Sequence, residues 1–217
     1  MLDSVIFDFD GTLVDSSPGI FHTALYTVRE LGITEEFSDA DLRRFVGPPL
    51  RDCFHAAFNL DPSLVDRAVE IYREEYQRTG RHMMKLYPGM KDALSELSSM
   101  GMKLAVATFK GEDLVNECVE ELGISEYFSS VHGSDRNESR TKGRIIEMTM
   151  EDMHAPQSSV IMIGDTVNDL KGAENAHVAF LPVTYGFGFT ENDGLDPSAS
   201  SPVEIPDIIK KLNGGIQ

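Results

Sequence analysis

Short apolar runs alternate along this chain with longer segments whose apolar residues recur at helical spacing. When a helix follows each strand and carries the chain back across the sheet, the strands pair in parallel. This alternation is the strongest constraint on folding in the sequence, and it predicts an α/β fold built on a parallel sheet. The expected strands are Val5–Phe9, Met102–Thr108, Tyr127–Ser134, Ser158–Asp165 and His177–Val183.

The alternation is interrupted after the first expected strand by a stretch that is helical almost throughout. Helix-start signals recur in it, such as Ser38 placed three residues before Asp41, and Asp61 directly before a proline. We expect four helices here: Pro18–Leu31, Ser38–Val46, Pro49–Phe58 and Pro62–Thr79.

A helical block inserted into a sheet protein indicates a second, small domain. Turn-forming residues gather at both of its ends, so the hinges are expected at Asp15–Pro18 and Met84–Gly89. The predicted organisation is a core of residues 1–15 and 84–217 with a helical insert of residues 16–83.

Composition and charge exclude several classes of partner. The 217 residues carry a net charge of −17, whereas a nucleic-acid groove needs clustered Lys and Arg to neutralise phosphates. No apolar run is long enough to span a bilayer.

Cys53 and Cys118 are far apart and have no metal-type spacing, which favours free thiols and a cytoplasmic protein. The acidic surface favours a monomer or a weak homodimer.

Two carboxylates stand one residue apart at the end of the first expected strand. On a strand, the side chains of Asp8 and Asp10 would point to the same side. Two like charges that close repel, and each raises the cost of ionising the other. We therefore expect a cation between them or a proton shared by them.

Polar residues also end the other expected strands. Thr108 ends the second, and Asp165 ends the strand before a helix that would carry Asp169 one turn further on. The carboxyl ends of parallel strands share one edge of a sheet, where ligands bind, so these residues should converge with Asp8 and Asp10. A single Asp at such a place is explained well enough as a turn or helix cap. Several at one edge favour a hard divalent cation, with Mg²⁺ as the first candidate.

Four segments in this order resemble the haloacid dehalogenase superfamily of phosphotransferases. They are "DFDGTLVDS" (Asp8–Ser16), the strand-ending Thr108, Lys142 and "GDTVND" (Gly164–Asp169). The resemblance covers essentially the whole chain. It implies a Rossmann-like parallel core, with the helical insert as the smaller cap domain of that family.

The resemblance implies a role for each charged residue. Asp8 would be the nucleophile that attacks phosphorus and forms an aspartyl-phosphate. Asp10 would protonate the leaving alcohol and later take a proton from the attacking water. Lys142 would neutralise developing charge and hold Asp8. Asp8, the backbone carbonyl of Asp10 and Asp165 would bind Mg²⁺, and Asp169 would orient Lys142 or a water on the metal.

Lys142 lies in "SRTKGR", which also contains Arg140 and Arg144. The alternative interpretation of this segment is a solvated basic turn before a helix that starts near Gly143. The position of Lys142 in the order of the motifs favours it as the functional residue.

Uncharged residues would complete the phosphate site. Gly11 would let the backbone approach the phosphoryl group, Thr12 would support the loop, and Thr108 would hydrogen-bond a phosphoryl oxygen. Members of the family often carry a small or polar residue after that threonine, but this chain has Phe109, followed by Lys110. The backbone N–H of Phe109 can still face phosphate, and we expect its ring to pack against the cap or the substrate.

The insert contains the expected specificity element. "RRFVGPPLRDCF" (Arg43–Phe54) resembles the cap loop of phosphoglycolate phosphatases and of the related 5′-nucleotidase-like branch, and "GSDRNESRTK" (Gly133–Lys142) is similar to the latter. Arg51 is our candidate for binding a substrate anion, since arginine meets a carboxylate or phosphate bidentately. A plain helix–helix connection with solvated arginines is the alternative.

The predicted function is therefore a Mg²⁺-dependent phosphatase for a small monoester, either phosphoglycolate-like or a nucleoside monophosphate. A pyrophosphatase and a β-phosphoglucomutase-like sugar-phosphate mutase are alternatives. Mutases usually have a histidine early in the first cap helix, but here Ile20 takes that place and His22 falls two residues later. A dehalogenase is disfavoured because that branch lacks a second aspartate at the position of Asp10. A non-catalytic binding or regulatory protein stays open as an alternative from another class.

Overall fold

The computed structural model describes residues 1–214, and the chain divides into two compact units. One unit combines Met1–Val14 with the chain from Leu86 onward, and the other is Asp15–Lys85. The chain passes between them at two short strands, β2 (Val14–Asp15) and β3 (Lys85–Leu86), which form a two-stranded sheet.

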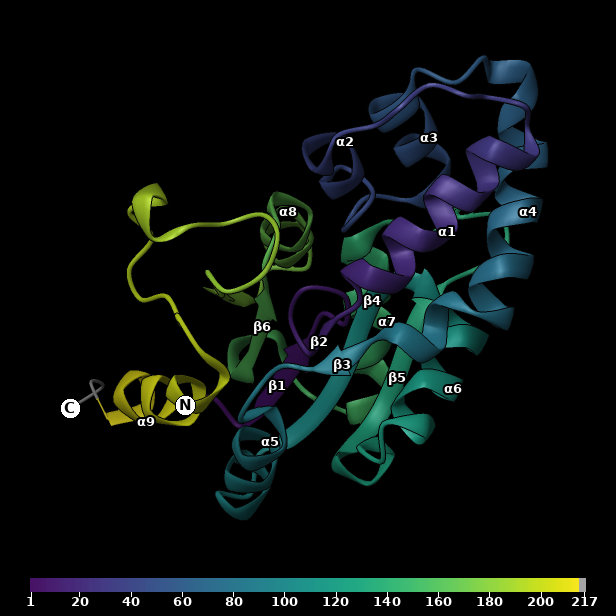
Figure 1. Cartoon of the computed structure of the whole chain (residues 1–217). Coiled ribbons are helices and arrows are strands. Elements are labelled where there is room, and N and C mark those ends of the chain that lie inside the picture. The colour runs from purple at the N-terminus through teal and green to yellow at the C-terminus, as the bar shows by residue number, and fades with distance from the viewer. Residues whose placement is uncertain (215–217) are drawn as a thin grey trace. The chain divides into compact units, whose positions relative to one another are not determined.

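Five strands of the described chain form one parallel sheet, in the order β5-β4-β1-β6-β7 (Figure 1). Their bounds are β1 Ser4–Phe7, β4 Lys103–Gly111, β5 Phe128–Ser134, β6 Val160–Gly164 and β7 Ala179–Pro182. The central strand β1 is buried along its whole length, which explains its unbroken apolar run. The predicted α/β fold with a parallel sheet is confirmed.

Helices cover the sheet on both faces. The helices of this unit are α5 Met90–Ser99, α6 Glu112–Glu121, α7 Lys142–Met153, α8 Val167–Asn175 and α9 Ile205–Gly214. Helix α7 packs on β4 and β5 through Ile145 and Ile146, which share a buried cluster with Ile6. The crossover through α6 steps from β4 out to β5, whereas the one through α7 returns from β5 to β6. Right-handed crossovers in opposite directions place α6 and α7 on opposite faces.

Two strand ends differ from the sequence prediction, and both lie at the edge where ligands are expected. Strand β1 ends at Phe7, because the N–H groups of Thr12, Leu13 and Val14 all bond to the carbonyl of Phe9 in a tight turn. Strand β4 continues past the predicted end at Thr108 to Gly111, with a shift in its register against β5. Asp8 and Asp10 therefore lie beyond the end of β1, and Asp10 forms an isolated β-bridge with Val14.

The second unit is all-helical. It contains α1 Ser17–Glu30, α2 Asp39–Arg43, α3 Leu50–Phe58 and α4 Val65–Arg78, one for each expected helix. Ser38 and Asp41 form the reciprocal capping box at the start of α2. That helix ends earlier than expected, because its last N–H groups bond three residues back and tighten the final turn. Phe45, Phe54 and Tyr72 form the buried aromatic core of this unit.

Two further predictions concern the cysteines and membrane-spanning helices. Cys53 and Cys118 are both buried thiols rather than disulfide partners, as expected. Within residues 1–214, no helix has the combined length and apolar character needed to cross a membrane.

Candidate active site

Asp8 follows β1 directly and is held by backbone and side-chain contacts. Its N–H donates to the carbonyl of Ile163 on β6 at 2.9 Å, and Lys142 Nζ donates to its Oδ1 at 2.6 Å. The carboxylate is almost completely buried. This burial raises the pKa of Asp8 to about 6, with the Lys142 ammonium opposing and the neighbouring Asp169 carboxylate reinforcing the shift.

Lys142 lies between two carboxylates. It is the first residue of α7, after the N-cap Thr141, and its Nζ is 2.7 Å from Asp169 Oδ1 as well as 2.6 Å from Asp8 Oδ1. Burial alone would lower the pKa of Lys142, but the carboxylates of Asp169 and Asp8 more than offset it and raise the pKa. Lys142 is therefore a cation fixed against Asp8.

The two arginines near Lys142 have other partners. Arg140 Nη1 donates to Glu112 Oε2 at 2.5 Å and to the carbonyl of Gly133 at 2.9 Å. Arg144 pairs with Glu147 and with a second glutamate on the exposed side of α7. Of the three basic residues in this segment, Lys142 is the one that reaches the carboxylates.

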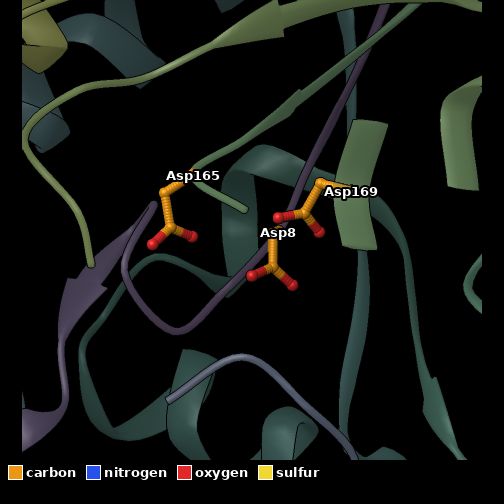
Figure 2. A group of neighbouring side chains, drawn as sticks. All are labelled: Asp8, Asp165 and Asp169. Atoms are coloured by element: carbon orange, nitrogen blue, oxygen red, sulfur yellow. The ribbon is translucent and has the colours of Figure 1, made fainter. Parts of the chain in front are cut away.

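Asp165 completes a cluster of three carboxylates at this edge of the sheet. One oxygen from each of Asp8, Asp165 and Asp169 lies within 4.8 Å of the others, and all three side chains are buried (Figure 2). Burial raises the pKa of Asp165 to about 8, and the charges of Asp169 and Asp8 add to the shift. The cluster holds more negative charge than one ammonium can neutralise.

This donor set fits a hard divalent cation. Asp169 has both oxygens engaged, Oδ1 with Lys142 and Oδ2 with the N–H and hydroxyl of its helix cap Thr166. Asp165 also accepts a bond at each oxygen, but both donors are neutral, the Thr12 hydroxyl and the Phe187 N–H. Asp8 and Asp165 are therefore the better candidate ligands, and Asp169 is a candidate to orient the Lys142 that it contacts. A cation beside them would favour the ionised carboxylates and so oppose the raised pKa values of Asp8 and Asp165.

The turn after β1 is built around Asp165. Gly11 has a φ of +86°, and a Cβ there would lie 2.3 Å from Asp165 Oδ2, so the position excludes any side chain. Thr12 is fully buried, and its hydroxyl donates to Asp165 Oδ1 at 3.3 Å. Sequence reasoning assigned Gly11 to the phosphoryl group, but its closest structural constraint is the Asp165 carboxylate.

A second loop that sequence reasoning missed encloses Asp165 from the other side. This loop, Tyr185–Phe189, follows β7, and the N–H of Phe187 donates to Asp165 Oδ2 at 2.8 Å. A Cβ on Gly186 would lie 2.4 Å from both the Asp165 Cβ and the Gly11 carbonyl oxygen. The available signal was "YGFGF", with two glycines among aromatic residues directly after a strand.

Asp10 is not part of the carboxylate cluster. Lys110 Nζ lies 3.1 Å from its Oδ1 and 3.2 Å from its Oδ2, and both side chains are mostly buried. The side chains of Asp8 and Asp10 thus contact different lysines, Lys142 and Lys110. Sequence reasoning noted Lys110 only as the residue after Phe109 and gave it no role.

Thr108 and Phe109 lie beside these groups at the end of β4. Thr108 is buried, and its hydroxyl oxygen accepts the N–H of Lys110 at 3.2 Å. Phe109 packs against the buried cluster under α7, and its ring centroid is 5.5 Å from Lys142 Nζ. The ring therefore lies next to the lysine of the core, and its packing against the cap or the substrate stays a prediction.

Arg51, the expected anion-binding residue, lies in the helical unit. Its Nη1 is 2.5 Å from Asp66 Oδ1 in a solvent-exposed pair. Such pairs contribute about 0–1 kcal/mol, so a substrate anion can compete with Asp66. His22, the residue weighed for the mutase alternative, contacts the buried Glu75 at 3.2 Å.

Comparison with known proteins agrees with this geometry. The family model for haloacid dehalogenase-like hydrolases matches residues 5–183. A 5′-nucleotidase of Pseudomonas aeruginosa is 33% identical over 186 residues, covering 85% of this chain and 84% of that protein. A phosphoglycolate phosphatase of Vibrio parahaemolyticus is 31% identical over 217 residues, covering 96% of this chain and 93% of that protein.

A solved structure is similar over almost the whole chain. The crystal structure of a predicted phosphatase from Clostridium acetobutylicum superposes with a TM-score of 0.89 at 33% identity. The match covers 97% of this chain and 100% of that one. The chain therefore belongs to the haloacid dehalogenase-like hydrolases, and within that family it is a phosphoric monoester hydrolase.

Proposed function

We propose that the protein hydrolyses a small-molecule phosphate monoester with Mg²⁺ and through a phosphorylated Asp8. The observation that carries the proposal is the buried Asp8 held by Lys142 beside Asp165. Phosphatases of this family generally use a divalent metal, and the carboxylate cluster suits one.

In the first half-reaction, a carboxylate oxygen of Asp8 attacks phosphorus and the bond from phosphorus to the leaving oxygen breaks. Asp10 gives its proton to that oxygen, so the alcohol leaves uncharged. Lys142, already fixed against Asp8, stabilises the negative charge that develops on the phosphoryl oxygens, and the Thr108 hydroxyl donates to one of them.

In the second half-reaction, water attacks the phosphorus of the aspartyl-phosphate. Asp10, now ionised, takes the proton of this water, and the bond between phosphorus and the Asp8 oxygen breaks. Inorganic phosphate leaves, and both aspartates return to their starting states. One residue thus serves as acid and then as base.

Asp8, Asp165 and the backbone carbonyl of Asp10 would hold the Mg²⁺ ion. When bound, the ion supplies positive charge against the phosphoryl oxygens and against the crowded carboxylates. Asp169 keeps Lys142 in place, and the loop Tyr185–Phe189 keeps Asp165 in place.

The substrate class proposed is phosphoglycolate-like or a nucleoside monophosphate, supported by the named activities of the two relatives above. Residues 1–15 and 84–217 would be the catalytic core, and residues 16–83 would be the cap that selects the leaving group. The division of the chain into two units at nearly the same residues supports this assignment.

The test is phosphate release from a panel of esters: phosphoglycolate, nucleoside monophosphates, sugar phosphates, pyrophosphate and p-nitrophenyl phosphate. We expect turnover of a monoester with Mg²⁺, loss of turnover in EDTA, and no turnover by Asp8→Asn, because an amide cannot attack phosphorus. Undiminished turnover in EDTA, or by Asp8→Asn, would contradict the proposal. Isomerisation of a sugar phosphate without phosphate release would indicate the mutase alternative.

A further inference from the structure

Two lysines of this site pair with different carboxylates. Lys142 is engaged by Asp8 and Asp169, whereas Asp10 is held at both oxygens by Lys110. The Lys110 side chain is 5% exposed, and its Nζ lies 5.4 Å from the centroid of the buried Phe9 ring. Lys110 is thus a buried cation directed at the one carboxylate that has to exchange a proton in the proposed reaction.

The backbone at Lys110 is shaped to produce this contact. From Ala107 to Gly111, β4 advances four residues while its β5 partners advance two, from His132 to Ser134. Irregularities of this kind next to active sites re-aim side chains.

Two further contacts fix the irregular segment. The N–H of Lys110 donates to the Thr108 hydroxyl oxygen at 3.2 Å. On the neighbouring strand, a Cβ on Gly133 would lie 2.3 Å from the Lys110 carbonyl oxygen, so only glycine permits this close approach of β5.

We infer that Lys110 is a positioning residue that holds the Asp10 carboxylate in the orientation needed for proton transfer to the leaving oxygen. The inference rests on the proposed function, in which Asp10 is the acid and base. A proton donor must come within about 2.6–3.2 Å of its acceptor, so rotation of the carboxylate out of line removes the catalytic advantage. A bond to each oxygen prevents that rotation and leaves the remaining lone pairs of both oxygens available.

The test compares two leaving groups with the same phosphoryl group. The alkyl phosphate that the wild-type protein hydrolyses fastest needs a proton on its leaving oxygen, whereas p-nitrophenolate leaves without one. The measured quantity is kcat/KM, which reports the steps up to formation of the aspartyl-phosphate. Lys110→Met should lower kcat/KM about ten- to a hundredfold for the alkyl phosphate, the range typical of a lost charge-assisted bond. For p-nitrophenyl phosphate it should change little.

Matched variants separate this role from folding and from phosphate binding. Lys110→Arg keeps the charge and should restore part of the loss on the alkyl phosphate. Lys103→Met removes another lysine of β4, one whose Nζ donates to the carbonyl of Met153, and should behave like the wild type. In an Asp10→Asn background, Lys110→Met should cause no further loss, because the group it positions is already inactive.

Three outcomes would overturn the inference. One is an equal loss on both substrates, which would mean that Lys110 acts on the phosphoryl group or the fold. Another is a full additional loss in the Asp10→Asn background, and a third is no loss at all. Failure of the proposed function would look different, because Asp10→Asn itself would then show no preference between the leaving groups, and the role of Lys110 would be rejected with it. If Lys110→Met does not fold, the same comparison is made with Lys110→Arg. A positioning role predicts that this variant loses kcat/KM only for the alkyl phosphate.

Discussion

At the residue scale, burial decides how the acidic groups of the site behave. Asp8 and Asp165 both lie in a water-poor region with Asp169, and their pKa values are raised to about 6 and about 8. Asp10 is more exposed and pairs with Lys110. The cluster thus favours protonation or a bound cation, and this preference has a measurable consequence for stability.

The first prediction is that the metal-free protein loses stability as pH rises from about 4 to about 8. In the unfolded chain these carboxyls ionise near 3.8, but in the folded protein they stay protonated up to about 6 and 8. The folded state therefore binds more protons across this interval, and its free energy of unfolding falls with pH. Melting temperatures in EDTA should fall over this range.

Two controls belong to this measurement. Mg²⁺ should raise the melting temperature increasingly toward pH 8, because it binds the ionised carboxylates. Asp165→Asn should flatten the pH dependence in EDTA, since it removes the group with the larger shift. A wild-type melting temperature that does not fall, or a variant that falls just as steeply, would show that these groups ionise normally.

At the element scale, two loops that are distant in sequence enclose one carboxylate. The turn after β1 contributes the Thr12 hydroxyl, and the loop after β7 contributes the Phe187 N–H. The Tyr185 hydroxyl joins the two loops by donating to the Thr12 carbonyl at 2.9 Å. Because Gly11 and Gly186 both lie against Asp165, the loops can close only where side chains are absent.

The second prediction is that Gly186→Ala weakens metal binding. The added methyl group would lie 2.4 Å from the Asp165 Cβ, so the loop or the carboxylate has to move. Loss of such supporting contacts typically costs about ten- to a hundredfold in metal affinity. The Mg²⁺ concentration for half-maximal activity should rise by that factor, and saturating Mg²⁺ should restore part of kcat.

Gly111→Ala is the matched control for this substitution. Its Cβ would meet no atom within 4 Å, and its φ of −55° suits any residue. The control should keep the wild-type requirement for Mg²⁺. An unchanged requirement in Gly186→Ala would mean that Asp165 is not a metal ligand or that the loop yields without effect.

At the scale of the whole molecule, the acidic chain has to accept an anionic substrate. With a net charge of −17, its overall field repels a phosphate ester. Lys142 supplies a local positive charge at the sheet edge, and a cation bound by the carboxylate cluster would add to it. Discrimination between leaving groups is then expected from the helical unit, which contains none of the groups assigned to phosphoryl transfer.

The third prediction concerns Arg51 of that unit. If Arg51 binds a substrate anion, Arg51→Ala should lower kcat/KM for the anionic natural substrate about ten- to a hundredfold, corresponding to roughly 1.5–3 kcal/mol. Turnover of p-nitrophenyl phosphate should change little.

Asp66→Asn provides the control, because it removes the competing partner of Arg51 and leaves the arginine itself in place. This variant should keep or increase kcat/KM for the anionic substrate. Equal losses on both substrates in Arg51→Ala would make Arg51 structural, and no loss on either would assign the anion to another residue of the unit.

The sequence by itself determined the local elements and the class of chemistry. Short apolar runs and apolar residues at helical spacing depend only on neighbours along the chain, so the strands and the four helices of the insert were predictable to within a few residues. The order of the motifs likewise predicted that Asp8, Thr108, Lys142 and Asp165 meet at one edge, because a parallel sheet collects its strand ends there.

Only the tertiary structure decided which charge meets which. Lys110 and Asp10 are 100 residues apart, and Lys142 and Asp8 are 134 apart, so their pairing depends on strand order and on the shifted register of β4. Beyond the end of β1 at Phe7, Asp8 contacts Lys142 and Asp10 contacts Lys110. Neither apolar periodicity nor sequence motifs predict these lysine–aspartate contacts. Each contact depends on packing between segments that meet only after the sheet has formed.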